Sequence, residues 1–127
     1  ACLARGIGQI VWSPLAQGIL TGKYEPGRAP PEGSRATSET MSLFLTRRLD
    51  DRLLERVRAL VPIARDLGLT VSQLALAWVL RRPEVASAIV GASRPEQVSE
   101  NARASGVSLA AEAVARIEAA LGDARLG

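Results

Sequence analysis

Residues 85–104 read VASAIVGASRPEQVSENARA, and in this stretch an apolar segment leads directly into a helical one. The apolar part, residues 85–92, is short and contains β-branched residues, which predicts a buried strand of the kind found in parallel sheets. Ser93 and Glu96 have the spacing of a capping box. They predict that a helix begins here and continues to about Ala104.

A second strand signal lies near the start, where residues 7–18 read IGQIVWSPLAQG. Residues 7–12 are mostly apolar and predict another buried strand, which Ser13 and Pro14 end. The chain then changes character from Gln17 to about Asp50, where glycine and proline are frequent and no apolar period survives. This segment predicts a long irregular loop, and such loops in compact domains are usually functional or mobile.

Amphipathic helices are predicted on either side of the second strand. Over residues 53–67 the apolar side chains follow steps of three and four, which places them on one stripe. Pro62 is expected to kink or restart this helix, because its ring nitrogen has no hydrogen to donate. After the second strand and its helix, Ser108 is expected to cap a last amphipathic helix, within which residues 109–121 form the helical body.

Thr70 and Gln73 form another capping box, which opens a helix predicted to reach about residue 82. Residues 71–77 superficially resemble the helix of a helix-turn-helix DNA-binding protein. That alternative fails, because Pro83 and an apolar strand follow where a second helix should come after a short turn.

The order of strands and helices predicts an α/β fold with parallel strands. Two strands alone do not make an α/β core, since both outer edges stay open and the faces are poorly covered. The chain is therefore either part of a larger protein or completes its sheet with copies of itself as a homo-oligomer. We expect the first arrangement.

The composition bounds the function. The 127 residues are 47% hydrophobic and 23% charged, which is typical of a single globular unit. The longest wholly apolar run, residues 74–80, is far shorter than the roughly 20 residues that cross a bilayer, and no signal peptide is recognisable. The single cysteine, Cys2, excludes an intramolecular disulfide framework. We expect a cytoplasmic protein that does not enter a membrane.

The chain contains no histidine, which excludes a histidine general base, a Ser-His-Asp triad and histidine ligands for a metal. With one cysteine as well, no metal site is predicted. The formal net charge is +3, and acidic residues are interleaved with the arginines. This pattern favours a solvated surface over a nucleic-acid-binding face.

Two segments are candidates for a binding site, because ligands of parallel α/β folds bind at the C-terminal ends of the strands. The first, residues 12–18, begins with Trp12, whose ring offers a broad aromatic surface. In the second, residues 91–101, a strand enters a helix N-terminus, where free N–H groups and the helix dipole favour an anion. Each segment also has an interpretation without a ligand: Trp12 can be a core residue, and Ser93 can simply cap an ordinary helix.

Within the second segment the side chains suit a phosphorylated ligand. Gly91 has no side chain to block close approach, the Ser93 hydroxyl can donate to a phosphate oxygen, and Arg94 carries a permanent charge. Gln97 and Asn101 follow Ser93 at steps of four, on one helix face with Glu100 beside them. Amide and carboxylate groups there would suit the donors of a purine.

These motifs resemble those of the aldo-keto reductases. Residues 12–24, WSPLAQGILTGKY, are similar to the seventh-strand motif, in the variant of the branch with the potassium-channel β subunits and their bacterial relatives. Residues 89–101, IVGASRPEQVSEN, resemble the last strand and the NADP(H)-binding helix, and residues 73–80, QLALAWVL, resemble the seventh barrel helix. The resemblance covers nearly the whole of residues 1–127.

The resemblance implies a fold and a cofactor. The family fold is a (β/α)8 TIM barrel with two extra helices, of which this chain would supply the C-terminal part: the last two β/α units plus both extra helices. Trp12 would stack on the nicotinamide and Ser93, with its neighbours, would hold the adenosine ribose and 2′-phosphate. The full implied NADP(H) site comprises Trp12, Ser13, Pro14, Leu15, Ala16 and Gln17 around the nicotinamide and pyrophosphate, Lys23 and Arg35 closing over it, Gly91, Ala92, Ser93, Arg94 and Gln97 at the ribose phosphate, and Glu100 and Asn101 at the adenine.

The chain departs from the family in its catalytic groups. The family resemblance implies a tetrad of Asp, Tyr, Lys and His from the first four strands, and no position of that tetrad is present here. The leading hypothesis is the C-terminal part of an NADPH-dependent reductase acting on a small carbonyl substrate. The alternative is an NADP(H)-binding regulatory or redox-sensing subunit. An intact tetrad in the preceding sequence would favour the enzyme.

Overall fold

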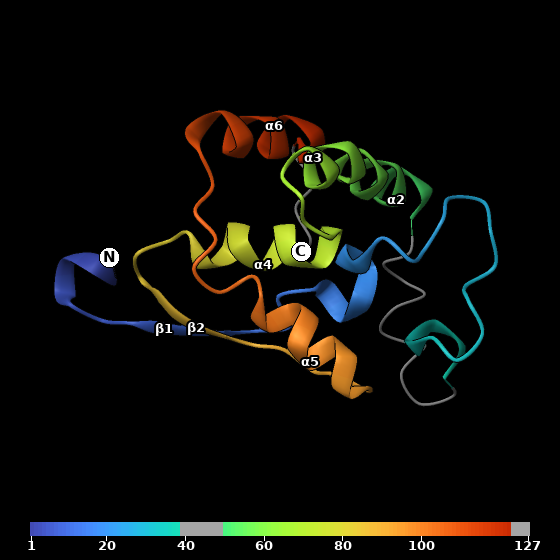
Figure 1. Ribbon diagram of the computed structural model, residues 1–127, viewed down its shortest axis with the longest axis horizontal. Helices are drawn as coiled ribbons and strands as arrows, with labels where there is room; N and C mark the ends of the chain where they lie inside the picture. The colour runs from blue at the N-terminus through green and yellow to red at the C-terminus, as the bar shows by residue number, and fades with distance from the viewer. Residues whose placement is uncertain (39–49, 123–127) are drawn as a thin grey trace.

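The computed structural model describes residues 1–38 and 50–122, in which a layer of helices, a central helix and a two-stranded sheet are stacked on one another (Figure 1). The elements, in chain order, are η1 (Leu3–Arg5), β1 (Gln9–Trp12), η2 (Ala16–Thr21), η3 (Arg35–Thr37), α2 (Asp51–Arg58), α3 (Leu60–Asp66), α4 (Val71–Leu80), β2 (Val85–Ile89), α5 (Pro95–Ala102) and α6 (Ala111–Leu121). The predicted long loop contains two short 3-10 helices, η2 and η3. Residues 39–49 of this loop lie outside the described residues.

The two strands pair in parallel, as predicted, with Trp12 opposite Ile89 at their C-terminal ends. Strand β1 ends at Trp12 as predicted but begins only at Gln9, and β2 begins at Val85 as predicted but ends at Ile89, before the predicted Ala92. The prediction that they are buried is wrong for one face of the sheet. Ile10, Trp12 and Ile89 are 68%, 78% and 60% exposed. Within the described residues the helices pack on the opposite face, so nothing covers these three side chains.

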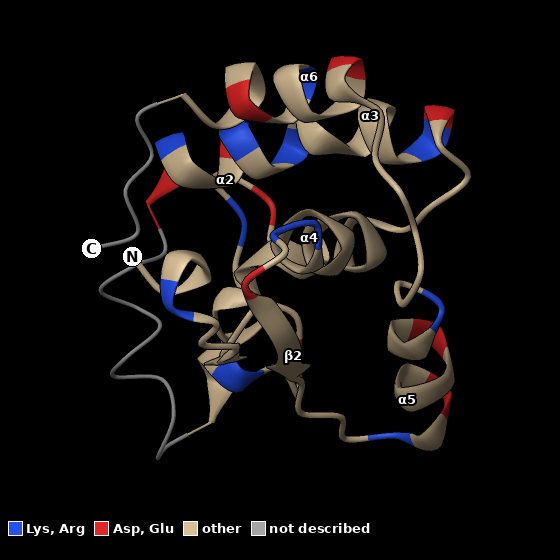
Figure 2. Cartoon of the chain, turned by 90° about the vertical axis from the view of Figure 1, so that its left-hand side faces the viewer, with Lys and Arg blue, Asp and Glu red and all other residues tan. Residues whose placement is uncertain are grey.

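Helix α4 lies at the centre of the structure, between the sheet and the layer of α2, α3 and α6 (Figures 1 and 2). It carries no charged residue, and its residues from Val71 to Ala77 are all buried. A helix that is apolar on all sides must be covered on all sides. The charged residues coloured in Figure 2 lie instead on the surrounding helices and on the connecting loops. Leu74 is 1% exposed and belongs to the main hydrophobic core.

The predicted capping box of α4 is confirmed. The Thr70 hydroxyl accepts from the Gln73 backbone N–H at 3.2 Å, and the Gln73 side chain accepts from the Thr70 N–H at 3.0 Å. The break expected at Pro62 is confirmed too. Helix α2 ends at Arg58, and α3 begins at Leu60.

The helices predicted after Ser93 and after Ser108 are present as α5 and α6, but both predicted N-cap residues are wrong. Ser93 and Glu96 do not form a capping box, because the Gln97 side chain takes the Ser93 N–H at 2.8 Å and Arg94 becomes the N-cap of α5. Ser108 does not cap the last helix. Helix α6 begins at Ala111 after an extended Ala110, which has no side-chain cap.

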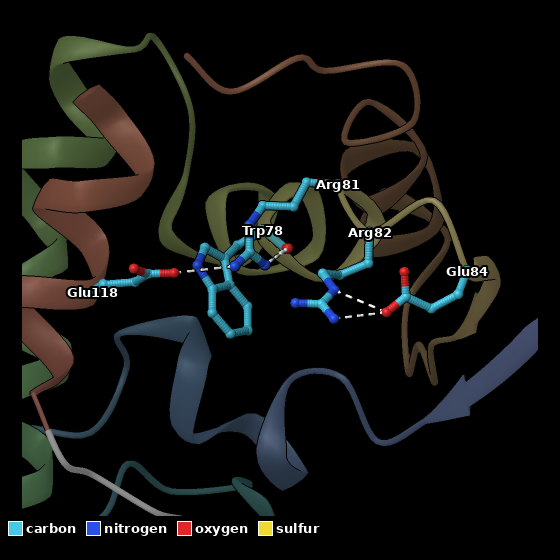
Figure 3. Close-up of polar contacts among 5 residues, drawn as sticks. All are labelled: Trp78, Arg81, Arg82, Glu84 and Glu118. Atoms are coloured by element: carbon cyan, nitrogen blue, oxygen red, sulfur yellow. Dashed lines mark hydrogen bonds and ion pairs between the residues drawn. The ribbon is translucent and has the colours of Figure 1, made fainter. Parts of the chain in front are cut away.

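The C-terminal end of α4 is tied to α6 by one arginine (Figure 3). The guanidinium carbon of Arg81 lies 4.0 Å from the centre of the Trp78 ring. Its nitrogens donate to the Trp78 carbonyl and, at 3.2 Å, to a carboxylate oxygen of Glu118 on α6. Beside it, Arg82 and Glu84 form an ion pair at 2.7 Å. These contacts fix the turn that leads from α4 into β2.

Over the described ranges 1–38 and 50–122, no single helix is long and apolar enough to cross a membrane. The segment of α2 and α3 together with α4 reaches the required length and composition only as a pair bent by 88°.

Candidate cofactor cleft

A cleft of about 510 Å³ lies where β1 and β2 end and α5 begins. It gathers residues from both predicted segments, and nearly all the predicted site residues line it. These are Ser13, Pro14, Leu15, Gln17, Lys23, Arg35, Gly91, Ala92, Ser93, Arg94, Gln97, Glu100 and Asn101. Of the predicted residues, Trp12 and Ala16 do not line it.

The segment after β1 has an unusual backbone. Ser13, Ala16 and Gln17 adopt φ angles of 54°, 48° and 59°, in the left-handed region that residues other than glycine seldom enter. Each such residue costs of order 1–3 kcal/mol, and such residues cluster at functional sites. The turns are held by backbone bonds from Ala16 N–H to Ser13 and from Gly18 N–H to Leu15, each 2.9 Å.

A chain of side-chain hydrogen bonds crosses the cleft. Arg35 Nη1 donates to Gln17 Oε1 at 2.7 Å, and Gln17 Nε2 donates to Ser13 Oγ at 3.0 Å. The other guanidinium nitrogen of Arg35 lies 3.2 Å from where a Cβ at Gly91 would stand. Arg35 therefore bridges the segment after β1 and the segment after β2, and a side chain at position 91 would displace it.

Lys23 covers the floor of the cleft near Gly18. Its Nζ lies 3.4 Å from where a Cβ at Gly18 would stand and 5.1 Å from the centre of the Tyr24 ring. Gly18 has a φ of 99°, which a residue with a side chain would adopt only under strain. Because Gly18 has no side chain, the Lys23 side chain can pack directly against the backbone at this position.

The N-terminus of α5 forms the far wall. Gln97 Oε1 accepts from the Ser93 N–H at 2.8 Å and from the Ser93 hydroxyl at 3.2 Å. Arg94 is exposed, and no side-chain partner is recorded for it among the described residues. Pro95 occupies the first turn of this helix. The helix dipole and the arginine both favour a negative group here.

The position of α5 depends on α4. The side chain of Gln73, 6% exposed, donates through Nε2 to the Glu100 carbonyl at 2.9 Å. The same side chain caps its own helix. A buried residue of the core helix thus holds the last turn of α5, where Glu100 and Asn101 line the cleft.

The charges that line the cleft are mostly positive. Lys23, Arg35 and Arg94 face one carboxylate, that of Glu100. Guanidinium groups pair well with phosphate oxygens, and the helix N-terminus adds to their attraction. Because Gly91 has no side chain, the Arg35 guanidinium can lie close to the backbone there. The donor set therefore fits a group that carries several phosphates.

Gly18 lies within the first candidate segment, and the lining residues that the sequence analysis missed are Thr21, Gly33, Ser72, Ile89 and Val90. Ser72 gave a signal, because it and Gln73 are the two polar residues of α4 and both lie in its first turn. Trp12 lies outside this lining, on the exposed face of β1. The individual roles assigned to all these residues remain predictions.

The family comparison agrees with the sequence motifs. Residues 1–121 match the model of the aldo/keto reductase family. The chain is 48% identical over 99 residues to a probable voltage-gated potassium channel subunit beta of Arabidopsis thaliana, which covers 78% of this chain and 30% of that protein. It is 44% identical over 116 residues to a protein of the same description from Oryza sativa, which covers 90% of the chain and 35% of the relative.

An enzyme is also among the relatives. The chain is 38% identical over 124 residues to the L-glyceraldehyde 3-phosphate reductase of Escherichia coli O157:H7, covering 95% of this chain and 35% of the reductase. The chain thus spans about a third of the length of these curated relatives.

Proposed function

Because the chain belongs to the aldo/keto reductase family, we propose that it forms the C-terminal part of a (β/α)8 barrel that binds NADP(H). The complete barrel is an oxidoreductase of the cytoplasm that transfers hydride between the nicotinamide and a carbonyl or alcohol substrate. One observation carries the proposal: two motifs about 80 residues apart meet in one cleft at the ends of adjacent parallel strands.

The residues of the cleft would divide the cofactor between them. The turn at residues 13–17 and the side chains of Lys23 and Arg35 would bind the pyrophosphate. Ser93, Arg94 and the N-terminus of α5 would bind the 2′-phosphate, with Glu100 and Asn101 at the adenine. When bound, NADPH supplies the hydride for the carbonyl carbon.

The open face of the sheet completes this proposal. Trp12, Ile10 and Ile89 are exposed on the face opposite α4. Exposed apolar side chains on a sheet face are typical of a surface that another part of the structure covers. The remaining strands of a barrel would cover Ile10 and Ile89, and Trp12, at the end of β1, would present its ring to the nicotinamide.

Proton transfer to the carbonyl oxygen needs a donor and a group that stabilises the developing negative charge. This chain offers neither, since Tyr24 is 5% exposed and packed in the core and Lys23 belongs to the cofactor cleft. We therefore place these groups in the earlier strands of the barrel. The 127-residue chain alone is expected to be inactive.

A second candidate is favoured by the two channel-subunit relatives, whose identity to this chain exceeds that of the reductase. In this alternative the barrel binds NADP(H) and reports its presence to a partner protein. Both candidates use the same cleft, so they differ in turnover and not in binding.

The test is NADPH oxidation, followed at the nicotinamide absorbance band with a panel of aldehydes. The complete barrel is expected to show carbonyl-dependent oxidation that Trp12→Ala weakens, while the 127-residue chain shows none. Tight NADPH binding without turnover would support the regulatory subunit. Carbonyl-dependent oxidation by the 127-residue chain itself would overturn the assignment of the catalytic groups to earlier strands.

A further inference from the structure

The hydrogen bonds from Arg35 through Gln17 to Ser13 have a fixed direction. Arginine has only donors, so the Gln17 atom at 2.7 Å from Arg35 Nη1 must be the amide oxygen. The amide nitrogen then faces Ser13 Oγ at 3.0 Å, and this nitrogen can only donate. The Ser13 hydroxyl oxygen is therefore an acceptor in this bond.

This direction decides what Ser13 offers to the cleft. A hydroxyl that accepts from Gln17 keeps its own hydrogen for another partner, and among the described residues no acceptor is recorded for it. Hydrogen bonds in a chain polarise one another, and the chain starts at a permanent cation. Ser13 lines the cleft together with Gln17 and Arg35. It is thus prepared to donate to a negatively charged oxygen.

We infer that Gln17 is a positioning residue, which holds Arg35 across the cleft and directs the Ser13 hydroxyl to donate to a ligand phosphate. This inference rests on the proposed function, because it takes the pyrophosphate of NADP(H) as that ligand. Gln17 has a φ of 59°. The strained backbone therefore lies at Gln17, the residue whose side chain orients both Arg35 and Ser13.

Gln17→Glu is the informative variant, because it keeps the shape and reverses one hydrogen bond. A carboxylate at position 17 still pairs with Arg35, but it has no hydrogen to donate to Ser13. The Ser13 hydroxyl would then donate to Glu, and its lone pairs would meet the phosphate. Pyrophosphate and NADPH should bind about tenfold more weakly or worse, as for the loss of a charge-assisted hydrogen bond.

The added negative charge would also repel phosphate, and a double-mutant cycle with Ser13→Ala separates the two effects. The complete barrel is titrated calorimetrically with NADPH, inorganic pyrophosphate and adenosine 2′-phosphate. We expect Gln17→Glu to weaken pyrophosphate binding clearly less in the Ser13→Ala background than in the wild type. Adenosine 2′-phosphate, which would use the α5 end of the cleft, should bind equally to every variant. Circular dichroism of each variant reports separately that it is folded.

An equal loss in both backgrounds would show simple charge repulsion and overturn the inference, as would a loss of adenosine 2′-phosphate binding by a folded Gln17→Glu variant. If Gln17→Glu does not fold, Gln17→Met replaces it in the same cycle. A wild-type barrel that binds neither NADPH nor pyrophosphate would refute the proposed function, and the inference with it.

Discussion

Gln73→Ala is expected to affect both the stability of the fold and the cofactor cleft. The Gln73 side chain is 6% exposed and makes two hydrogen bonds, accepting from the Thr70 N–H at 3.0 Å and donating to the Glu100 carbonyl at 2.9 Å. The first belongs to the capping box of α4 and the second holds α5. Alanine removes both and leaves a small cavity beside α4.

The size of the effect follows from these contacts. Each hydrogen bond contributes about 0.5–1.5 kcal/mol net, so the free energy of unfolding should fall by roughly 1–3 kcal/mol. The matched control is Thr70→Ala, which removes one capping bond and should cost about 1 kcal/mol. Only Gln73→Ala also removes the hydrogen bond from α4 to the Glu100 carbonyl of α5. It should therefore also weaken NADPH binding, by up to about tenfold, the equivalent of one hydrogen bond.

The assay is urea unfolding followed by circular dichroism, with NADPH titration of the same variants of the complete barrel. Both measurements are needed. The free energy of unfolding reports the loss of the capping box, and the NADPH affinity reports whether α5 has moved. Equal NADPH affinity for Gln73→Ala and Thr70→Ala would refute the claim that Gln73 positions the cofactor helix. If Gln73→Ala lowers the free energy of unfolding by less than about 0.5 kcal/mol, the claim that the two hydrogen bonds of this buried side chain stabilise the fold is refuted.

Three further predictions concern the fold. The isolated 127-residue chain should fold poorly or self-associate through its open sheet face, so a monomer that unfolds cooperatively in calorimetry would contradict this. In urea unfolding of the complete barrel, Leu74→Ala, at a core position 1% exposed, should cost about 2–5 kcal/mol, whereas Leu3→Ala, at a position 59% exposed, should cost little. The hydrogen bond from Arg82 lowers the pKa of Glu84, so the ionised carboxylate stabilises the fold above its unfolded-state pKa, and this contribution is lost as the pH falls through the lowered value. Arg82→Ala should raise that pKa toward the ordinary carboxyl value in an NMR titration; an unchanged pKa would show that the ion pair does not form in solution.

Capping patterns and prolines in the sequence predicted helix boundaries correctly where no other side chain competed for the same backbone group. Thr70 and Gln73 form the capping box that their spacing predicts, and Pro62 produces the break between α2 and α3. The prediction that Ser93 and Glu96 form a capping box was wrong, because a second acceptor for the Ser93 N–H lies one helical turn further along the chain. The Gln97 side chain reaches back to the Ser93 N–H, and a capping pattern of four residues does not include it.

The burial of the strands could not be predicted from this chain. Ile10 and Ile89 have the apolar character of core residues, yet each is more than half exposed. An apolar side chain indicates that a residue suits a core, but whether it is covered depends on which elements pack against it. Here the helices cover one face of the sheet only.

The sequence predicted most of the residues that line the cleft, but it did not predict the hydrogen bonds between them. The position of both motifs after parallel strands placed their residues at one edge of the sheet, where the structure gathers all of the predicted set except Trp12 and Ala16. The bond between Arg35 and Gln17, residues 18 apart in sequence, depends on the path of the intervening loop. No periodicity or capping rule specifies such a path.

The central claim, that this cleft recognises the 2′-phosphate of NADP(H), is tested most directly by the affinities of NADPH and NADH. Both are measured by fluorescence titration of the complete barrel, as wild type and as Arg94→Glu. The control is Arg103→Glu, the same change of charge just past the C-terminal end of α5, at an exposed residue that does not line the cleft. We predict that wild type prefers NADPH and that Arg94→Glu weakens NADPH binding by about 1–3 kcal/mol, with NADH and the control nearly unchanged. Equal loss for both cofactors, or no preference in the wild type, would contradict the account.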